Sequence, residues 1–203
     1  MIFDAATLGA DAFYPLMLQT IVPRPIAWVL SRNAGGTFNV APFSFFNGVS
    51  SEPPLLMISV GRRDDGTQKD TWANIAARED FVVHVPPVEQ VAAVVATSAP
   101  LPAGASELDF ARLETARVEG ETLPRLVGPK AAMFCRKHRI VEMGGEGMGV
   151  IFGEVRRLWV DDAAVTIAGG RTKIDPAALD PLARLGGKTY SGLGKVFDVE
   201  RPR

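Results

Sequence analysis

From Ile26 onward, apolar and polar residues follow the pattern of β-strands over much of the chain. Asn33 and the glycines after it supply a turn, which predicts a hairpin between the first two strands. Pro53 and Pro54 stop the third strand, and the next run is apolar on both alternating faces, as in a strand buried on both sides. The strands predicted here cover residues 26–32, 37–42, 44–51, 55–61 and 81–85.

The remaining pattern predicts helices, one long loop and two long strands. Trp72, Ile75 and Ala76 share one face of a short helix. Pro87 opens a second helix, at a position where its missing N–H costs nothing. The predicted elements are helices over 71–78, 88–98 and 180–185, a loop over 98–130 with short helical pieces around 107–113, and strands over 131–143 and 148–161 joined by a glycine turn at 144–147.

Together these elements predict a mainly β fold with a few peripheral helices. The closely spaced hairpins favour an antiparallel sheet that closes into a small barrel. Strands and helices do not alternate regularly, which argues against a doubly wound α/β fold. A chain of 203 residues fits one domain of the larger kind, so we expect a single domain over residues 1–203.

Composition narrows the class of protein. Apolar residues make up 47% of the chain, enough for a real core, and the scattered charges sum to −1, unlike the basic surface of a nucleic-acid-binding protein. Cys135 is the only cysteine; we expect it to be an inert core residue in a reduced, cytoplasmic setting. The N-terminus carries Asp4 and Asp11 rather than a signal peptide, and no apolar run is long enough to predict a membrane span.

Several common catalytic motifs are absent from the sequence. It has no nucleophile elbow, no P-loop, no zinc-binding histidine pair on a helix and no dinucleotide fingerprint after a strand. His84 and His138 lie far apart, each within a predicted strand, where a packed or hydrogen-bonded histidine is the usual case. The sequence therefore names no catalytic acid or base and predicts no metal site.

Polar residues interrupt an apolar run where Pro42 also removes one backbone donor. Unpaired backbone groups beside small residues let a flat ligand approach the chain, and neighbouring phenylalanines would wall such a pocket. The alternative is an edge strand whose serines and asparagines face water. The residues concerned are Asn39, Ala41, Ser44, Asn47, Ser50 and Ser51, with Phe43, Phe45 and Phe46.

Three cations, Arg62, Arg63 and Lys69, lie close together in front of the helix over 71–78. A helix start offers unpaired N–H groups and a partial positive charge, which suit a phosphate. The alternative is that Asp70 or Thr71 simply caps the helix while the lysine is solvated. Arginine forks and a lysine that converge there would form a monophosphate site. Beside a pocket for a flat ligand, such a site favours flavin mononucleotide (FMN) over a sugar phosphate.

The stretch from Arg24 to Ile75 resembles the flavin reductase-like, FMN-binding split-barrel proteins. It carries R-P-I-A, N-x-A-P-x-S, S-x-x-P-P and K-D-T-x-x-N-I in that order, and "FVVHV", "GEV" and "DPLARLGGKTYSGLG" further along are also similar to the family. The resemblance therefore covers nearly the whole chain. It implies a split β-barrel that acts as a homodimer, with FMN near the subunit interface and NAD(P)H as a transient electron donor.

The resemblance also implies which residues contact the flavin. Those expected at the edge of the isoalloxazine are Asn39, Val40, Ala41, Pro42, Phe43 and Ser44. Those expected around the ribityl phosphate are Ser59, Val60, Gly61, Arg62, Lys69, Asp70 and Thr71, with the aspartate orienting the loop rather than touching the anion. Classical flavin reductases of the family carry a histidine just before "GEV", whereas this chain reads "GMGVIFGEV".

Two functions follow from the resemblance. The first is an FMN-binding oxidoreductase that accepts hydride from NAD(P)H and passes electrons to an unidentified acceptor, such as a partner oxygenase. The alternative is an FMN-binding electron carrier or flavin-storage protein without its own substrate pocket. The missing histidine favours the alternative.

Overall fold

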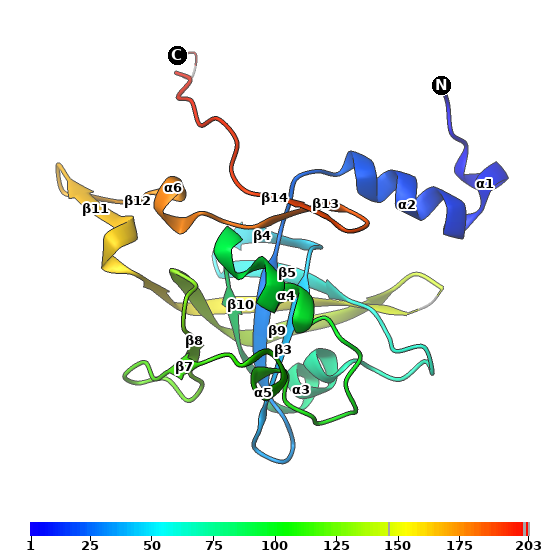
Figure 1. Cartoon of the computed structure of the whole chain (residues 1–203), viewed down its shortest axis with the longest axis horizontal. Coiled ribbons are helices and arrows are strands. Elements are labelled where there is room, and N and C mark those ends of the chain that lie inside the picture. Colours follow the sequence, from blue (N-terminus) through cyan, green and yellow to red (C-terminus); the bar gives the residue numbers. More distant parts are fainter. Residues whose placement is uncertain (146, 201, 203) are drawn as a thin grey trace.

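The computed structural model describes residues 1–145, 147–200 and 202. Its main sheet has seven antiparallel strands in the order β3-β2-β6-β9-β10-β5-β4 (Figure 1). These strands are β2 (Ala27–Arg32), β3 (Phe38–Phe43), β4 (Phe46–Ser51), β5 (Pro54–Val60), β6 (Asp80–His84), β9 (Ala131–Met143) and β10 (Met148–Val160). The two outermost strands, β3 and β4, follow one another in the chain but are not paired, so the barrel is split between them.

Helices and small sheets surround this barrel. The helices are α1 (Ala5–Leu8), α2 (Ala10–Thr20), α3 (Asp70–Arg78), α4 (Val91–Ala96), α5 (Glu107–Ala111) and α6 (Pro176–Leu179). The small sheets join β1 (Arg24–Pro25) with β13 (Ala183–Gly186) and β14 (Thr189–Ser191), β7 (Thr115–Ala116) with β8 (Arg125–Leu126), and β11 (Val165–Ala168) with β12 (Arg171–Ile174). In Figure 1, α1–α2 and β11–β12 extend away from the barrel at its upper right and upper left.

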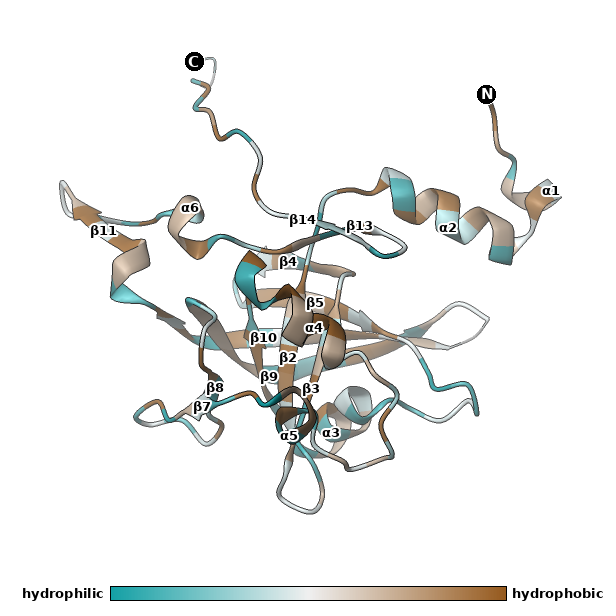
Figure 2. Cartoon of the chain, in the orientation of Figure 1, coloured by the Kyte–Doolittle hydropathy of each residue, from teal (hydrophilic) through white to brown (hydrophobic). Residues whose placement is uncertain are grey.

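Two hydrophobic clusters share the central strands. Val29 of β2 packs inside the barrel with residues of β5, β10 and α3, whereas Trp28 and Leu30 of the same strand face a second cluster under α4. Every residue from Ala27 to Ser31 is therefore buried. Figure 2 shows the contrast between the hydrophobic strands and the hydrophilic loop that leads from β5 to α3.

The structure confirms most predicted strands and corrects other predictions. The hairpins β2–β3 and β9–β10 lie where expected, although Glu146 of the predicted glycine turn is outside the described residues. β5 is buried on only one face, because alternate side chains such as Met57 remain half-exposed. The predicted helix over 180–185 is wrong: Ala183 and Arg184 belong to β13, which pairs with β1. The pattern gave no indication of α1 or α2.

The close packing inside the barrel gives a first prediction. A Cβ on Gly153 would lie 2.3 Å from Cζ of Phe81, a ring that the core holds fully buried. We expect Gly153→Ala to lower the free energy of unfolding by about 1–3 kcal/mol, the usual cost of overpacking. Gly48→Ala is the matched control, since a Cβ there meets nothing within 4 Å. Urea unfolding of both variants measures the difference, and equal stabilities would contradict this description of the core.

Candidate functional site

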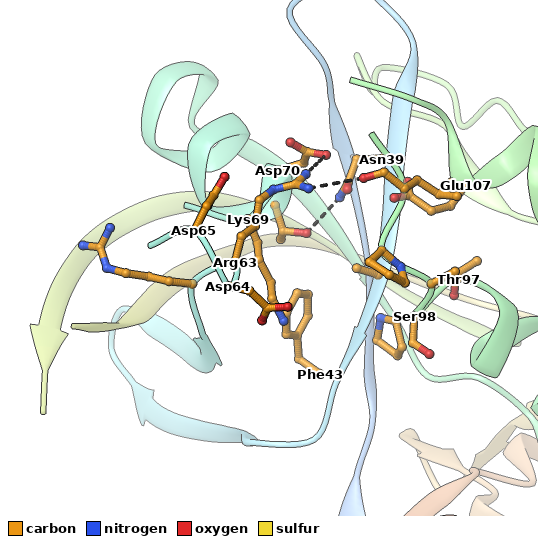
Figure 3. Close-up of a pocket in the computed structure, with 17 residues that line it drawn as sticks. Asn39, Phe43, Arg63, Asp64, Asp65, Lys69, Asp70, Thr97, Ser98 and Glu107 are labelled. Carbon is orange, nitrogen blue, oxygen red and sulfur yellow. Dashed lines mark hydrogen bonds and ion pairs between the residues drawn. The ribbon is translucent and has the colours of Figure 1, made fainter. Parts of the chain in front are cut away.

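A cavity of about 470 Å³ opens between β3, the loop that precedes α3, α5 and the segment after α4 (Figure 3). Its volume lies in the range of small-molecule sites. Many residues that the sequence assigned to flavin binding line this one cavity, although they come from two separate parts of the chain. They are Asn39, Ala41, Pro42, Phe43, Arg62, Lys69, Asp70 and Thr71.

Other candidate residues do not line the cavity: Val40, Ser44, Ser59, Val60 and Gly61. The side chains of Val40 and Val60 are fully buried in the two hydrophobic clusters. Ser44 Oγ accepts a hydrogen bond from Arg24 Nε at 3.4 Å. The N–H of Ser59 donates to the carbonyl of Phe45 at 2.9 Å. The two serine contacts therefore hold the short segment between β3 and β4 against β1 and β5.

A buried polar network fixes the inner wall of the cavity. Asn39 Nδ2 donates to Thr71 Oγ1 at 2.8 Å, and this bond ties β3 to the first turn of α3. Both residues are almost completely buried. Asn74, one helical turn further along, donates to Ser31 and Asn33 at 3.2 and 2.8 Å. Because buried and mutually bonded amides have little freedom, this wall is preorganised.

The two arginines of the predicted phosphate site are engaged within the chain. Arg62 donates to the carbonyls of Gly66 and Gly147 and to the carboxylate of Glu142, and its guanidinium lies 4.8 Å from the centre of the Trp72 ring. It therefore links the loop before α3 to the β9–β10 hairpin. The three predicted cations do not converge as free charges.

Arg63 pairs instead with the start of the helix. Its Nη2 lies 2.7 Å from Asp70 Oδ2, and its Nη1 donates to the carbonyl of Leu101 at 3.2 Å. The pairing agrees with the expectation that Asp70 orients the loop. The alternative, that Asp70 or Thr71 caps the helix, is wrong, because the N-cap residue is Lys69 and no side chain caps the first turn.

Lys69 is the cation that the site leaves available. Among residues 1–145, 147–200 and 202, its ammonium forms no hydrogen bond or ion pair, and the residue is exposed where it lines the cavity. In Figure 3 it lies between Asp65 and Phe43, next to the uncapped start of α3. An ammonium group and unpaired helix N–H groups together form a site for an anion.

Three residues that the sequence did not indicate also line the cavity: Thr97, Leu101 and Glu107. Thr97 is held in place by Trp28, whose Nε1 donates to its hydroxyl at 2.9 Å. Glu107 is buried, and its Oε2 accepts the N–H of Val40 at 2.9 Å. Burial raises the pKa of this carboxyl. Thr97 and Glu107 belong to predicted helical segments, but the local pattern does not show that these segments reach β3, so only the tertiary contacts bring them to the site.

The remaining chemically distinctive residues have structural roles. His84 is completely buried, its Nδ1 lies 3.0 Å from the carbonyl of Trp28, and its Nε2 accepts the N–H of Leu126. Burial lowers its pKa to about 4, so the ring is neutral near pH 7. Burial also raises the pKa of the Cys135 thiol. Within the described ranges no group of histidine, cysteine and acidic residues could hold a metal ion, and no helix is long and apolar enough to cross a membrane.

Comparisons with known proteins place this geometry in context. The family model described as "Flavin reductase like domain" matches residues 18–173. An uncharacterized protein of Halalkalibacterium halodurans is 38% identical over 200 residues, covering 97% of this chain and 94% of its own.

Two solved structures are similar over nearly the whole chain. Nitrilotriacetate monooxygenase component B from Bacillus cereus is 32% identical, with a TM-score of 0.89 and 98% of each chain covered. The 2-nitrobenzoate 2-nitroreductase of Pseudomonas fluorescens is 26% identical, with a TM-score of 0.88, and the match covers 100% of this chain and 96% of the other. The predicted fold class, a mainly β split barrel with a few peripheral helices, is confirmed.

Proposed function

The chain belongs to the flavin reductase-like family, and we propose that it is an FMN-dependent oxidoreductase that accepts hydride from NAD(P)H and passes electrons to a separate acceptor. One observation carries this proposal. The cavity combines an available lysine and an uncapped helix start with an apolar wall from Ala41 to Phe43. A terminal phosphate suits the lysine and the helix start, and a flat ring system suits the apolar wall.

The donor set of the cavity fits FMN. Lys69 and the first N–H groups of α3 would hold the phosphate, since charge-assisted bonds to an anion are the strong ones. Asp70 would not repel the anion strongly, because Arg63 already pairs with it. Phe43 and the backbone of β3 would hold the ring. The cavity volume of about 470 Å³ is large enough to hold most of a mononucleotide.

When bound, the flavin would supply the hydride and electron chemistry, and the protein would supply position and electrostatics. Lys69 binds the anion, and the bond between Asn39 and Thr71 keeps β3 and α3 at a fixed separation. Thr97, anchored by Trp28, holds the segment across the cavity. Bound in such a shielded pocket, the ring would be kept from bulk water on one side.

The relatives support further parts of the proposal. One is named as component B of a monooxygenase, which supports a partner oxygenase as the electron acceptor here. Family membership also supports a homodimer with the flavin near the subunit interface. We propose further that residues 1–203 form a single domain that acts in the cytoplasm. The second candidate is an electron carrier or flavin-storage protein. This second candidate is favoured because classical flavin reductases of the family carry a histidine before "GEV", whereas the described residues that line the cavity include no histidine.

Identification of the bound cofactor tests the proposal. We expect the purified protein to be yellow and to release FMN on denaturation, because the anion site is suited to a terminal phosphate at a helix start. Chromatography of the released material separates FMN from FAD. Recovery of FAD alone, or of no flavin even after incubation with FMN, would contradict the proposal.

A further inference from the structure

Glu107 is a buried acid in the wall of the cavity whose negative charge the proposed function has not yet used. The residue is 6% exposed, and its Oε2 accepts the Val40 N–H at 2.9 Å. Within the described ranges the carboxylate has no ion-pair partner, since the guanidinium of Arg63 nearby is already bound to Asp70. A buried carboxylate without a cation is costly, so a structural role alone explains it poorly.

The contact with Val40 lies on the open edge of β3, the side that faces away from β2. Ser106 Oγ donates to the carbonyl of Phe38 at 2.9 Å, and the Glu107 carboxylate accepts the Val40 N–H two residues further along. The two side chains thus take the place of a missing strand partner. Pro42, the next residue on this edge, has no N–H. The edge therefore presents only acceptors to the cavity, and their position depends on α5.

We propose that Glu107 is a positioning residue of the flavin site, which fixes the edge of β3 and whose negative charge lowers the midpoint potential of the bound flavin. The inference rests on the proposed function. Hydride carries two electrons and one proton, so its acceptance makes the ring more negative by one charge unless a proton follows. A carboxylate beside the cavity disfavours that extra charge relative to the oxidised ring.

The other charges around the cavity are arranged so that Glu107 is distinct. Arg63 and Asp70 largely cancel one another. Asp64 and Asp65 are exposed, so solvent screens their charges, and Asp65 also accepts from the N–H and hydroxyl of Thr67. Figure 3 shows Glu107 beside Asn39, on the opposite side of the site from Asp65. Within the described ranges Glu107 is therefore the buried carboxylate of the cavity wall that lacks a cation, whereas Asp64 and Asp65 are exposed to solvent.

Glu107→Gln separates charge from position, because the amide oxygen can still accept the Val40 N–H. We expect the FMN dissociation constant of Glu107→Gln to stay within about twofold of the wild-type value, because the bond to Val40 is kept. The reduced flavin should gain about tenfold in affinity relative to the oxidised flavin, the effect of one unit charge at roughly 10 Å in a partly desolvated site. This corresponds to a midpoint potential about 30 mV more positive.

Two further variants complete the test. Asp109→Asn removes an equal charge from an exposed position on α5 and should leave the potential unchanged. Glu107→Ala also loses the bond to Val40 and should weaken FMN binding about fivefold relative to Glu107→Gln. If Glu107→Ala fails to fold in a thermal melt, Glu107→Gln still decides the role of the charge.

Each result that contradicts the inference overturns a different part of it. A wild-type potential in Glu107→Gln, or an equal shift in Asp109→Asn, would overturn the role of the charge while leaving the proposed function intact. Equal FMN affinity in a folded Glu107→Ala would overturn the positioning role. Wild-type protein that binds no FMN would overturn both this inference and the proposed function.

Discussion

Lowering the pH from 6.5 to 4 is expected to remove about 3 kcal/mol of the free energy of unfolding through His84 alone. The pKa of this histidine falls from 6.5 to about 4 on folding, mainly because burial disfavours the charged ring. Each unit of difference is worth about 1.4 kcal/mol. Since the unfolded chain binds the proton first, the stabilisation is complete above pH 6.5 and is lost as the pH falls towards 4.

His84→Gln is the direct test, because glutamine can still donate to Trp28 and accept from Leu126 but does not titrate. Urea unfolding across this pH range should show a shallower loss of stability for His84→Gln than for the wild type. His138→Gln, at an exposed position, is the matched control and should follow the wild type. Some carboxylates, such as Glu79, have a lowered pKa in the folded chain, and their protonation at low pH reduces the stability of all three proteins alike. Parallel curves for His84→Gln and the wild type would contradict the neutral, buried histidine.

Lys69→Ala is expected to weaken FMN binding by about 1–3 kcal/mol, or roughly 5- to 150-fold in the dissociation constant. The Lys69 ammonium lies at the uncapped start of α3 and has no partner among the described residues, so it is available to bind the phosphate. Lys69→Arg should recover only part of the affinity, because a planar fork replaces a compact charge. Titration followed by flavin fluorescence measures both variants.

Lys173→Ala removes the same charge from an exposed position on β12, outside the cavity, and should bind FMN as the wild type does. All variants should remain folded, because neither lysine is part of a hydrophobic cluster. Unchanged affinity in both Lys69 variants would show that the lysine is only a solvated surface charge.

Features that depend on neighbouring residues were predictable from the sequence. The turn at Asn33 forms because its carbonyl accepts the N–H of Gly36 and its own N–H donates to Thr37, both within a few residues. The long hairpin of β9 and β10 follows equally from local pattern and glycines. The sequence also indicated that Lys69 and Asn39 belong to one site, through the resemblance that spans both.

Features that depend on distant partners were not predictable in the same way. Residues 180–185 suit a helix locally, but pairing of Ala183 with Pro25 and of Arg184 with Arg24 places the second half of this segment in a sheet. Arg62 has the chemistry of a phosphate ligand, yet a carboxylate 80 positions away holds it. Glu107 begins a short helical piece within a loop-rich stretch, and its contact with Val40, 67 positions away, is not visible in the local pattern. In each case a tertiary contact decides what local propensity leaves open.

The most direct test of the proposed function is the reaction of the FMN-loaded protein with NADH and NADPH in the absence of air. An oxidoreductase of the proposed kind bleaches the visible absorbance of the bound flavin within seconds with at least one donor, and admission of air or of an acceptor restores it. Lys69→Ala should require more added FMN for the same response. Bleaching by a chemical reductant but by neither nicotinamide would contradict the oxidoreductase and favour the electron carrier or flavin-storage protein.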